Sequence, residues 1–274
     1  MQRTPSLPRT SKPTQRPAWD LRILLPDSDF KMAREVPLNQ INEFVDERQK
    51  SWCIHCGGLI AERTCNVDHV PSKGLLRQPY PPNLPDVVVC KACNGGFSID
   101  EEYVIAFLGC VLAGSTDPER QTNPRVEGIL RHSPKLRQRI EQAKTEYSTL
   151  GGETRHVWKP EAERVNRIIL KNARGHAFFE CGEPMLEEPA CLWSAPLESL
   201  NMSQREQFEN VDMGAFWPEV GSRMLRRVVT GEDLSGGWVI VQEGVYRYSV
   251  MQRGRLLVRS VLSEYLATEV HWTW

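Results

Sequence analysis

Two cysteine pairs of the form C-x-x-C constrain the fold of this chain more than any other feature of its sequence. Cys53 and Cys56 form the first pair, Cys90 and Cys93 form the second, and 33 residues separate the pairs. Four thiolates on two such turns can surround one Zn²⁺ at about 2.3 Å and fill every coordination position, as in structural zinc sites. The pattern predicts one structural zinc that stabilises a segment with few core-forming residues. The alternatives are unrelated buried thiols, or a redox-active C-x-x-C that here lacks its usual βαβ context.

Polar residues between and beside the cysteine pairs indicate a second kind of chemistry. Asp68 and His69 are adjacent, and Asn94 directly follows Cys93. Carboxylate and amide oxygens are hard ligands that suit Mg²⁺ or Mn²⁺, and a neighbouring imidazole can take a proton from water. Hydrolysis of a phosphodiester needs both a cation that stabilises developing negative charge and a base that generates the nucleophile. These residues therefore predict a hydrolytic site.

The combined motif resembles that of the HNH endonucleases, in the branch where four cysteines hold a structural zinc beneath a ββα-metal core. The matching residues span about 45 of the 274 positions, in the order Cys53-x-x-Cys56, Asp68-His69-Val-Pro-Ser-Lys-Gly, Asn83-Leu84, Cys90-x-x-Cys93-Asn94. The resemblance implies that His69 is the general base and that Asp68 and Asn94 hold the catalytic Mg²⁺ or Mn²⁺. It also implies that Asn83 orients the base. Where the family carries a Lys or His after Cys-Asn, this chain has glycines, which leaves the catalytic ion fewer protein ligands.

The resemblance implies a metal-dependent endonuclease that acts on nucleic acid, with DNA preferred over RNA. It also implies a setting such as bacterial restriction or phage defence, with a protein partner from such a system. The rival hypothesis is a zinc-dependent nucleic-acid-binding adaptor whose HNH shell does not cleave. Asp68, His69 and Asn94 together favour the enzyme, because a binding module has no need of all three.

The charge balance excludes binding to a polyanion through net charge alone. Lys and Arg number 34 against 35 Asp and Glu, so any nucleic-acid contact must come from a local basic face. Between residues 119 and 174 the basic residues outnumber the acidic ones by 13 to 7. In that stretch Arg164, Arg167 and Lys171 have helical spacing and are candidate phosphate contacts, with a solvated helical face as the alternative. Lys73 is a further candidate, with a solvated turn lysine as its alternative.

The chain divides by composition into a Pro-rich basic tail at 1–26, an HNH module at 27–116 and a C-terminal α+β domain at 117–274. Apolar spacing predicts an amphipathic helix within 27–49. A capping-box pattern predicts a helix start at Ser98, and another helix is predicted from Pro160 to a C-terminal Gly175. His176 is interpreted as a core histidine. From Trp238 onward, strand-like runs separated by turns with Gly244 and Gly254 predict an antiparallel meander, so the fold class is α+β.

The sequence shows neither a secretory signal nor a membrane span. The first residues are basic but lack an apolar core segment, and no run approaches the ~18 apolar residues of a spanning helix. We therefore expect a cytoplasmic protein without membrane contacts, in which the 8 cysteines are thiols or metal ligands.

Overall fold

The computed structural model describes residues 38–41, 50–148, 154–211, 217–252 and 255–273. The tail predicted at 1–26 lies outside the described residues, as does most of the helix predicted within 27–49. Domain boundaries at 26/27 and 116/117 remain predictions.

A two-stranded hairpin followed directly by a long helix carries most of the motif residues. Strand β1 (Cys65–His69) pairs antiparallel with β2 (Asp86–Cys90), and α1 (Lys91–Ala113) begins at the residue after β2. Helix α1 packs against both strands. Its second half is nearly all apolar and buried, as expected for a helix enclosed by other elements.

A six-stranded antiparallel sheet forms the second half of the chain, in the order β5-β10-β9-β8-β7-β6. Its strands are β5 (Cys191–Pro196), β6 (Leu234–Ser235), β7 (Trp238–Gln242), β8 (Tyr246–Met251), β9 (Leu256–Leu262) and β10 (Leu266–Trp272). Strands β6 to β10 follow one another as neighbours, so the predicted antiparallel meander and the α+β class are confirmed.

The remaining elements surround these two parts. Helices α2 (Pro124–His132) and α3 (Pro134–Gln142) lead into a hairpin of β3 (Lys144–Ser148) and β4 (Thr154–Trp158). Helices α5 (Met202–Glu209) and α6 (Arg223–Thr230) lie between β5 and β6 in the chain. Short 3₁₀ helices occur at Ile60–Glu62, Lys73–Leu75, Pro118–Arg120 and Leu197–Ser199.

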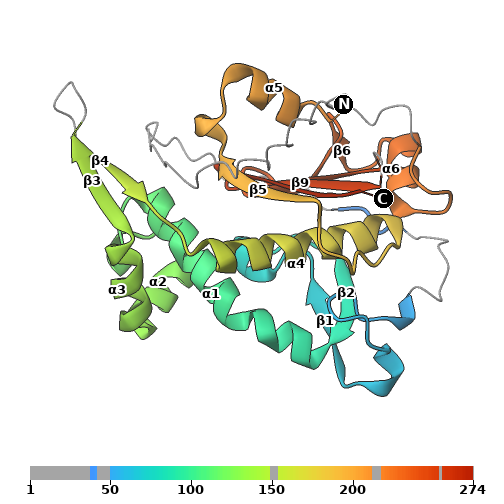
Figure 1. Cartoon of the computed structure of the whole chain (residues 1–274), viewed down its shortest axis with the longest axis horizontal. Helices are drawn as coiled ribbons and strands as arrows, with labels where there is room; N and C mark the ends of the chain where they lie inside the picture. Colours follow the sequence, from blue (N-terminus) through green and yellow to red (C-terminus); the bar gives the residue numbers. More distant parts are fainter. Residues whose placement is uncertain (1–37, 42–49, 149–153, 212–216, 253–254, 274) are drawn as a thin grey trace, which may run out of the picture.

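Helix α4 (Ala162–Cys181) lies between the large sheet and the hairpin-helix unit of β1, β2 and α1 (Figure 1). It contacts α1 and β2 on one side and β8, β9 and β10 on the other. One hydrophobic cluster joins Tyr103 and Phe107 of α1, Val165 and Ile168 of α4, and Tyr248 of the sheet. The core therefore continues across the predicted boundary at 116/117.

Two predicted helix ends are wrong. Ser98 does not start a helix, because α1 begins at Lys91, and its hydroxyl donates to the carbonyl of Gly95 within the helix. Gly175 does not end α4, which continues to Cys181 and stops at Gly182 with φ of 76°. Gly175 instead lies where a Cβ would be 2.6 Å from a methyl group of Val70, so its missing side chain permits close packing. In the described ranges, no helix is both long and apolar enough to cross a membrane.

Candidate metal centre and hydrolytic site

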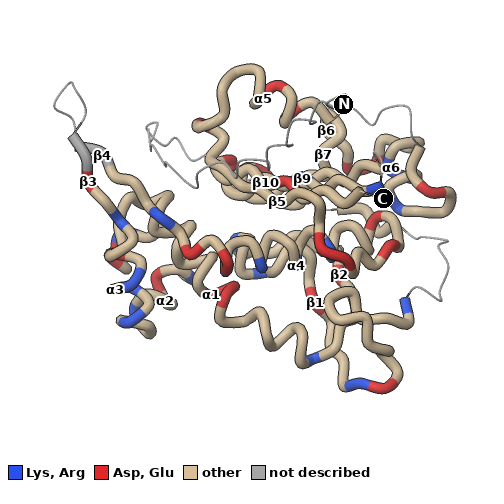
Figure 2. The backbone as a smooth tube through the Cα atoms, viewed as in Figure 1, with Lys and Arg blue, Asp and Glu red and all other residues tan. Residues whose placement is uncertain are grey.

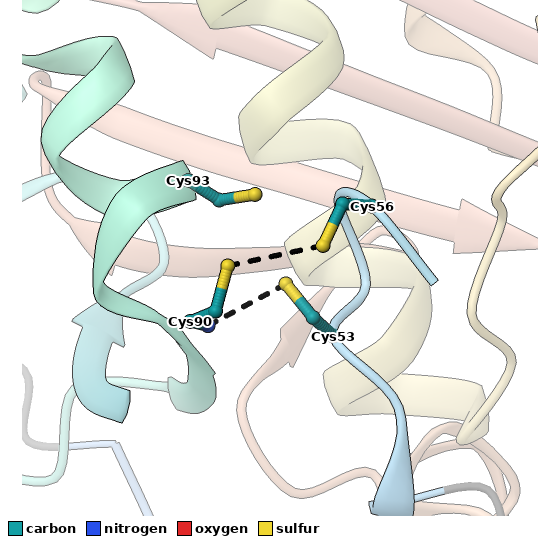
Figure 3. Close-up of side chains that lie close together, drawn as sticks. All are labelled: Cys53, Cys56, Cys90 and Cys93. Carbon is teal, nitrogen blue, oxygen red and sulfur yellow. Dashed lines mark hydrogen bonds between the residues drawn. The ribbon is translucent and has the colours of Figure 1, made fainter. Parts of the chain in front are cut away.

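The four cysteines of the two pairs come together in space, as predicted (Figure 3). Their sulfur atoms all lie within 4.8 Å of one another, and Cys56 Sγ is 3.8 Å from Cys90 Sγ. A tetrahedron with metal–sulfur bonds of about 2.3 Å has edges of about 3.8 Å. The donor set and its spacing therefore fit a Zn²⁺ ion.

The backbone of each pair explains why the cysteines converge. In the first pair, the amide of Gly57 donates to the carbonyl of Cys53 at 2.8 Å, and Gly57 has φ of 66°, a conformation that suits glycine. In the second pair, Cys90 ends β2 and Cys93 lies in the first turn of α1. The strand-to-helix junction therefore sets the separation of Cys90 and Cys93.

The cluster shifts the pKa values of its cysteines in different directions: burial raises those of Cys53 and Cys93, whereas that of Cys90 is lowered. Burial raises the pKa of Cys90, but hydrogen bonds from the backbone and thiol of Cys93 and from the other two thiols outweigh it and lower the pKa to about 7. The Arg63 guanidinium donates to Cys56 Sγ at 3.5 Å. A cation beside the cluster partly compensates the charge that four thiolates would carry.

The predicted base lies at the end of β1. His69 is half-buried, its Nδ1 is buried without a hydrogen-bond partner, and Asp86 is its cross-strand partner in the register. Burial lowers its pKa, and the positive charge of Lys73 lowers it further. Lys73 itself is exposed, which is compatible with either of its two interpretations.

Asn83 does not contact the predicted base through any hydrogen bond of the described residues. It has φ of 58°, and its side-chain amide donates to the backbone carbonyl of Leu38 at 3.0 Å. Asn94 is half-buried in the first turn of α1, directly after Cys93. The orienting role of Asn83 and the metal-binding role of Asn94 both stay predictions.

Asp68 is buried, and a side chain of helix α4 holds its carboxylate in place. It is 7% exposed, and one of its oxygens, Oδ1, accepts a hydrogen bond from Lys171 Nζ of α4 at 2.9 Å. Lys171 also donates to Glu101 Oε1 at 2.5 Å and to Ser72 Oγ at 2.9 Å. Burial raises the pKa of Asp68, but the nearby His55 and the Lys171 ammonium outweigh it and lower the pKa overall.

This buried group of Asp68, Glu101, Lys171 and Ser72 was not predicted from the sequence. Glu101 was interpreted as part of a helix cap, and the only signal for Ser72 was its position in the motif. Lys171 lies 103 residues from Asp68 in the chain, so no local pattern links the two. Two carboxylates and one ammonium leave the group with a net negative charge, which favours a cation nearby.

The three basic residues at helical spacing on α4 each form an ion pair with an acidic residue of α1. Arg164 and Arg167 both form ion pairs with Asp100, and their side chains are 23% and 54% exposed. Lys171 is 3% exposed, so its predicted contact with a phosphate does not fit its position. For Arg164 and Arg167 that role stays a prediction. Figure 2 shows basic positions gathered instead on α3, where Lys135, Arg137 and Arg139 occur.

Comparison of the chain with protein-family models, with curated proteins and with solved structures finds no match.

Proposed function

We propose that this protein is a metal-dependent HNH endonuclease that hydrolyses phosphodiester bonds in nucleic acid, with DNA preferred. One observation carries the proposal. The strand that ends in Asp68-His69 and the helix turn that holds Asn94 belong to one hairpin-helix unit, and two of the clustered cysteines lie at its strand-to-helix junction. The residues implied by the resemblance thus belong to elements that pack together.

The structural ion of this proposal is one Zn²⁺ held by Cys53, Cys56, Cys90 and Cys93. The spacing of the sulfurs supports it. Zinc binding would contribute to folding, because the ion would join ligands from two segments that lie 33 residues apart in the chain. The same ion would fix the first turn of α1, and with it Asn94.

His69 is the proposed base. Its Nδ1 is buried without a hydrogen-bond partner, although buried polar atoms in folded proteins usually have one, so the ring has hydrogen-bonding capacity left. In the proposed reaction one ring nitrogen takes a proton from the attacking water, and the water oxygen forms a bond to phosphorus while the bond to the leaving oxygen breaks. Exposed Lys73 stands near this ring and would attract the phosphate.

Asp68 and Asn94 would hold the catalytic Mg²⁺ or Mn²⁺. The fit rests on Asp68, whose carboxylate is buried and ionised, and whose Oδ1 is fixed by Lys171. A divalent ion bound there would stabilise the negative charge that develops on the phosphate and on the leaving oxygen. Lys171 acts in this scheme as a positioning residue, because it contacts Asp68 and Glu101 but is too buried to reach a substrate.

Cleavage by the zinc-loaded chain tests the proposal. Plasmid, linear and branched DNA and RNA are incubated with Mg²⁺ or Mn²⁺, and in parallel with EDTA. We expect metal-dependent cleavage that His69→Ala reduces by about 10²–10⁴-fold, with zinc content and nucleic-acid affinity retained. His132→Ala is the matched control, since His132 is an exposed histidine on α2. Absence of cleavage of every substrate, or full activity of His69→Ala, would overturn the proposal.

The hydrogen bond between Lys171 and Asp68 favours a second candidate, the non-catalytic nucleic-acid-binding adaptor. In that protein the ammonium of Lys171 would take the place of the catalytic cation on Asp68. Lys171→Met distinguishes the two. If Lys171 positions Asp68, the variant binds Mn²⁺ more weakly than the wild type. If Lys171 replaces the cation, the variant gains a Mn²⁺ site that the wild type lacks.

The biological setting in restriction or phage defence, and a protein partner from such a system, follow from the resemblance alone and remain part of the proposal.

A further inference from the structure

His55, which lies between Cys53 and Cys56 in the sequence, has its side chain beside Asp68 of the proposed hydrolytic site. Its side chain is 3% exposed, and its Nε2 is 4.0 Å from Asp68 Oδ2. The ring of Phe97 packs edge-on against the His55 ring with centroids 4.9 Å apart. His55 is therefore held in place by packing, with its ring beside the carboxylate oxygen that Lys171 does not contact.

Both ring nitrogens of His55 are buried and have no hydrogen-bond partner among the described residues. Buried polar atoms in folded proteins nearly always have a partner, so two orphaned nitrogens on one ring require an explanation. A hydrogen bond to Asp68 does not supply it, because such a bond needs a separation of about 2.7–3.2 Å. A partner that lies between His55 and Asp68 would supply the missing interaction of Nε2.

The separation of the two atoms fits shared ligation of one ion. In an octahedral site with bonds of about 2.1–2.2 Å, ligand atoms lie about 3 Å apart when adjacent and about 4.3 Å apart when opposite. The observed 4.0 Å between His55 Nε2 and Asp68 Oδ2 is close to the separation of opposite ligands. Lys171 already occupies Oδ1, so Asp68 offers Oδ2 on the side where His55 lies.

We propose that His55, through Nε2, is a further protein ligand of the divalent ion bound at Asp68. This inference rests on the proposed function, since it concerns the ion of the same site. The two sites then meet in one turn, with Cys53 and Cys56 holding the structural zinc and His55 between them binding the catalytic ion. Mg²⁺ takes oxygen ligands almost exclusively, so an imidazole ligand would make the site bind Mn²⁺ more tightly than Mg²⁺.

Mn²⁺ bound to the zinc-loaded full-length chain tests this inference without any activity measurement. Binding is followed by electron paramagnetic resonance, and electron spin echo modulation reports whether an imidazole nitrogen is directly coordinated. We expect the wild type to bind one Mn²⁺ with a nitrogen coupling. His55→Ala should lose the coupling and bind Mn²⁺ at least 10-fold more weakly, with its zinc retained. His69→Ala is the matched control and should keep the coupling.

The results separate the inference from the function on which it rests. A nitrogen coupling that is absent from the wild type, or unchanged in His55→Ala, overturns the role of His55. The proposed function stands in that case if Asp68→Asn still abolishes Mn²⁺ binding. A wild type that binds no Mn²⁺, even with DNA present, overturns both.

A second variant distinguishes loss of the nitrogen ligand from loss of the fold. His55→Gln keeps a polar side chain of similar length, and we expect it to retain zinc while it loses the nitrogen coupling. Loss of zinc from both His55→Ala and His55→Gln would place His55 in the zinc site and overturn the inference.

Discussion

Replacement of Lys171 by Met should lower the free energy of unfolding by about 3–5 kcal/mol, because it leaves a buried carboxylate without its cation. The side chains of Lys171 and Asp68 are 2% and 9% exposed, so water cannot replace the lost ammonium. Glu101 contributes less, because its side chain is 23% exposed and can turn toward solvent. Met preserves most of the length of the lysine stem, so the variant adds little cavity to the cost.

A double-mutant cycle isolates the pair from other effects of the substitution. Asp68→Asn removes the charge that Lys171 compensates, so the double variant should be destabilised by less than the sum of the single variants. We expect a coupling of about 1.5 kcal/mol or more, within the range of contacting buried groups. Urea unfolding of the zinc-loaded protein at pH 7 gives each free energy, and an unchanged dependence on urea shows that the unfolded states are comparable.

Arg167→Met is the matched control, because Arg167 lies one turn earlier on α4 and also pairs with an acidic residue of α1. Its side chain is 54% exposed, so its loss should cost no more than about 1 kcal/mol. A Lys171→Met variant that is as stable as the Arg167→Met control would refute the reasoning. A cycle in which the single effects simply add would refute it as well.

Four further outcomes follow from the structure. Cys90→Ser should expel the zinc and unfold the hairpin-helix unit, since structural sites contribute about 10–16 kcal/mol of apparent binding energy; elemental analysis that finds full zinc would contradict this. Burial lowers the pKa of His176 to about 3. Below the ordinary value of about 6.5 the unfolded chain therefore takes up a proton that the folded chain does not, and stability falls by up to about 5 kcal/mol as the pH drops from 6.5 toward 3. His176→Gln should flatten that dependence in urea titrations across the same pH range, and an unchanged slope would show that other groups cause it. Gly175→Ala should destabilise the protein by about 1–3 kcal/mol, because the new Cβ would lie 2.6 Å from Val70. Gly128→Ala, where a Cβ meets nothing within 4 Å, should stabilise α2 by up to about 1 kcal/mol. Thermal melts of both glycine variants measure these effects.

The features that the sequence predicted correctly are local or periodic. The cysteine pairs converge because each pair closes its own turn, and the hairpin of β1 and β2 brings the second pair beside the first. The strands from Trp238 onward are short apolar runs separated by glycine-containing turns, a local signal that needs no knowledge of distant residues. His176 was also interpreted correctly, since it is fully buried and its Nε2 lies 2.9 Å from the Tyr246 hydroxyl.

The features that the sequence could not predict depend on which distant segment covers a surface. The helical spacing of Arg164, Arg167 and Lys171 defines one face of α4, but the pattern does not say whether solvent or α1 lies against it. The structure places the acidic residues Asp100 and Glu101 there. Glu101, the last residue of the capping-box pattern that begins at Ser98, is a partner of the basic face instead. His55 lies between Cys53 and Cys56 in the sequence, and only the structure shows that its ring lies beside Asp68.

Helix α4 connects the two halves of the chain in a way that affects the candidate site. Near its C-terminal end, Glu180 is fully buried and accepts hydrogen bonds from Arg227 of α6 and from the Tyr248 hydroxyl of the sheet. These bonds fix the position of the helix along its axis. Lys171 lies nine residues earlier, about 13.5 Å away along a helix that rises about 1.5 Å per residue. Because a helix transmits an axial shift along its length, the register of α4 against the sheet determines whether the Lys171 ammonium reaches Asp68. The large sheet therefore helps to position the carboxylate of the candidate site, although none of its residues belongs to the motif.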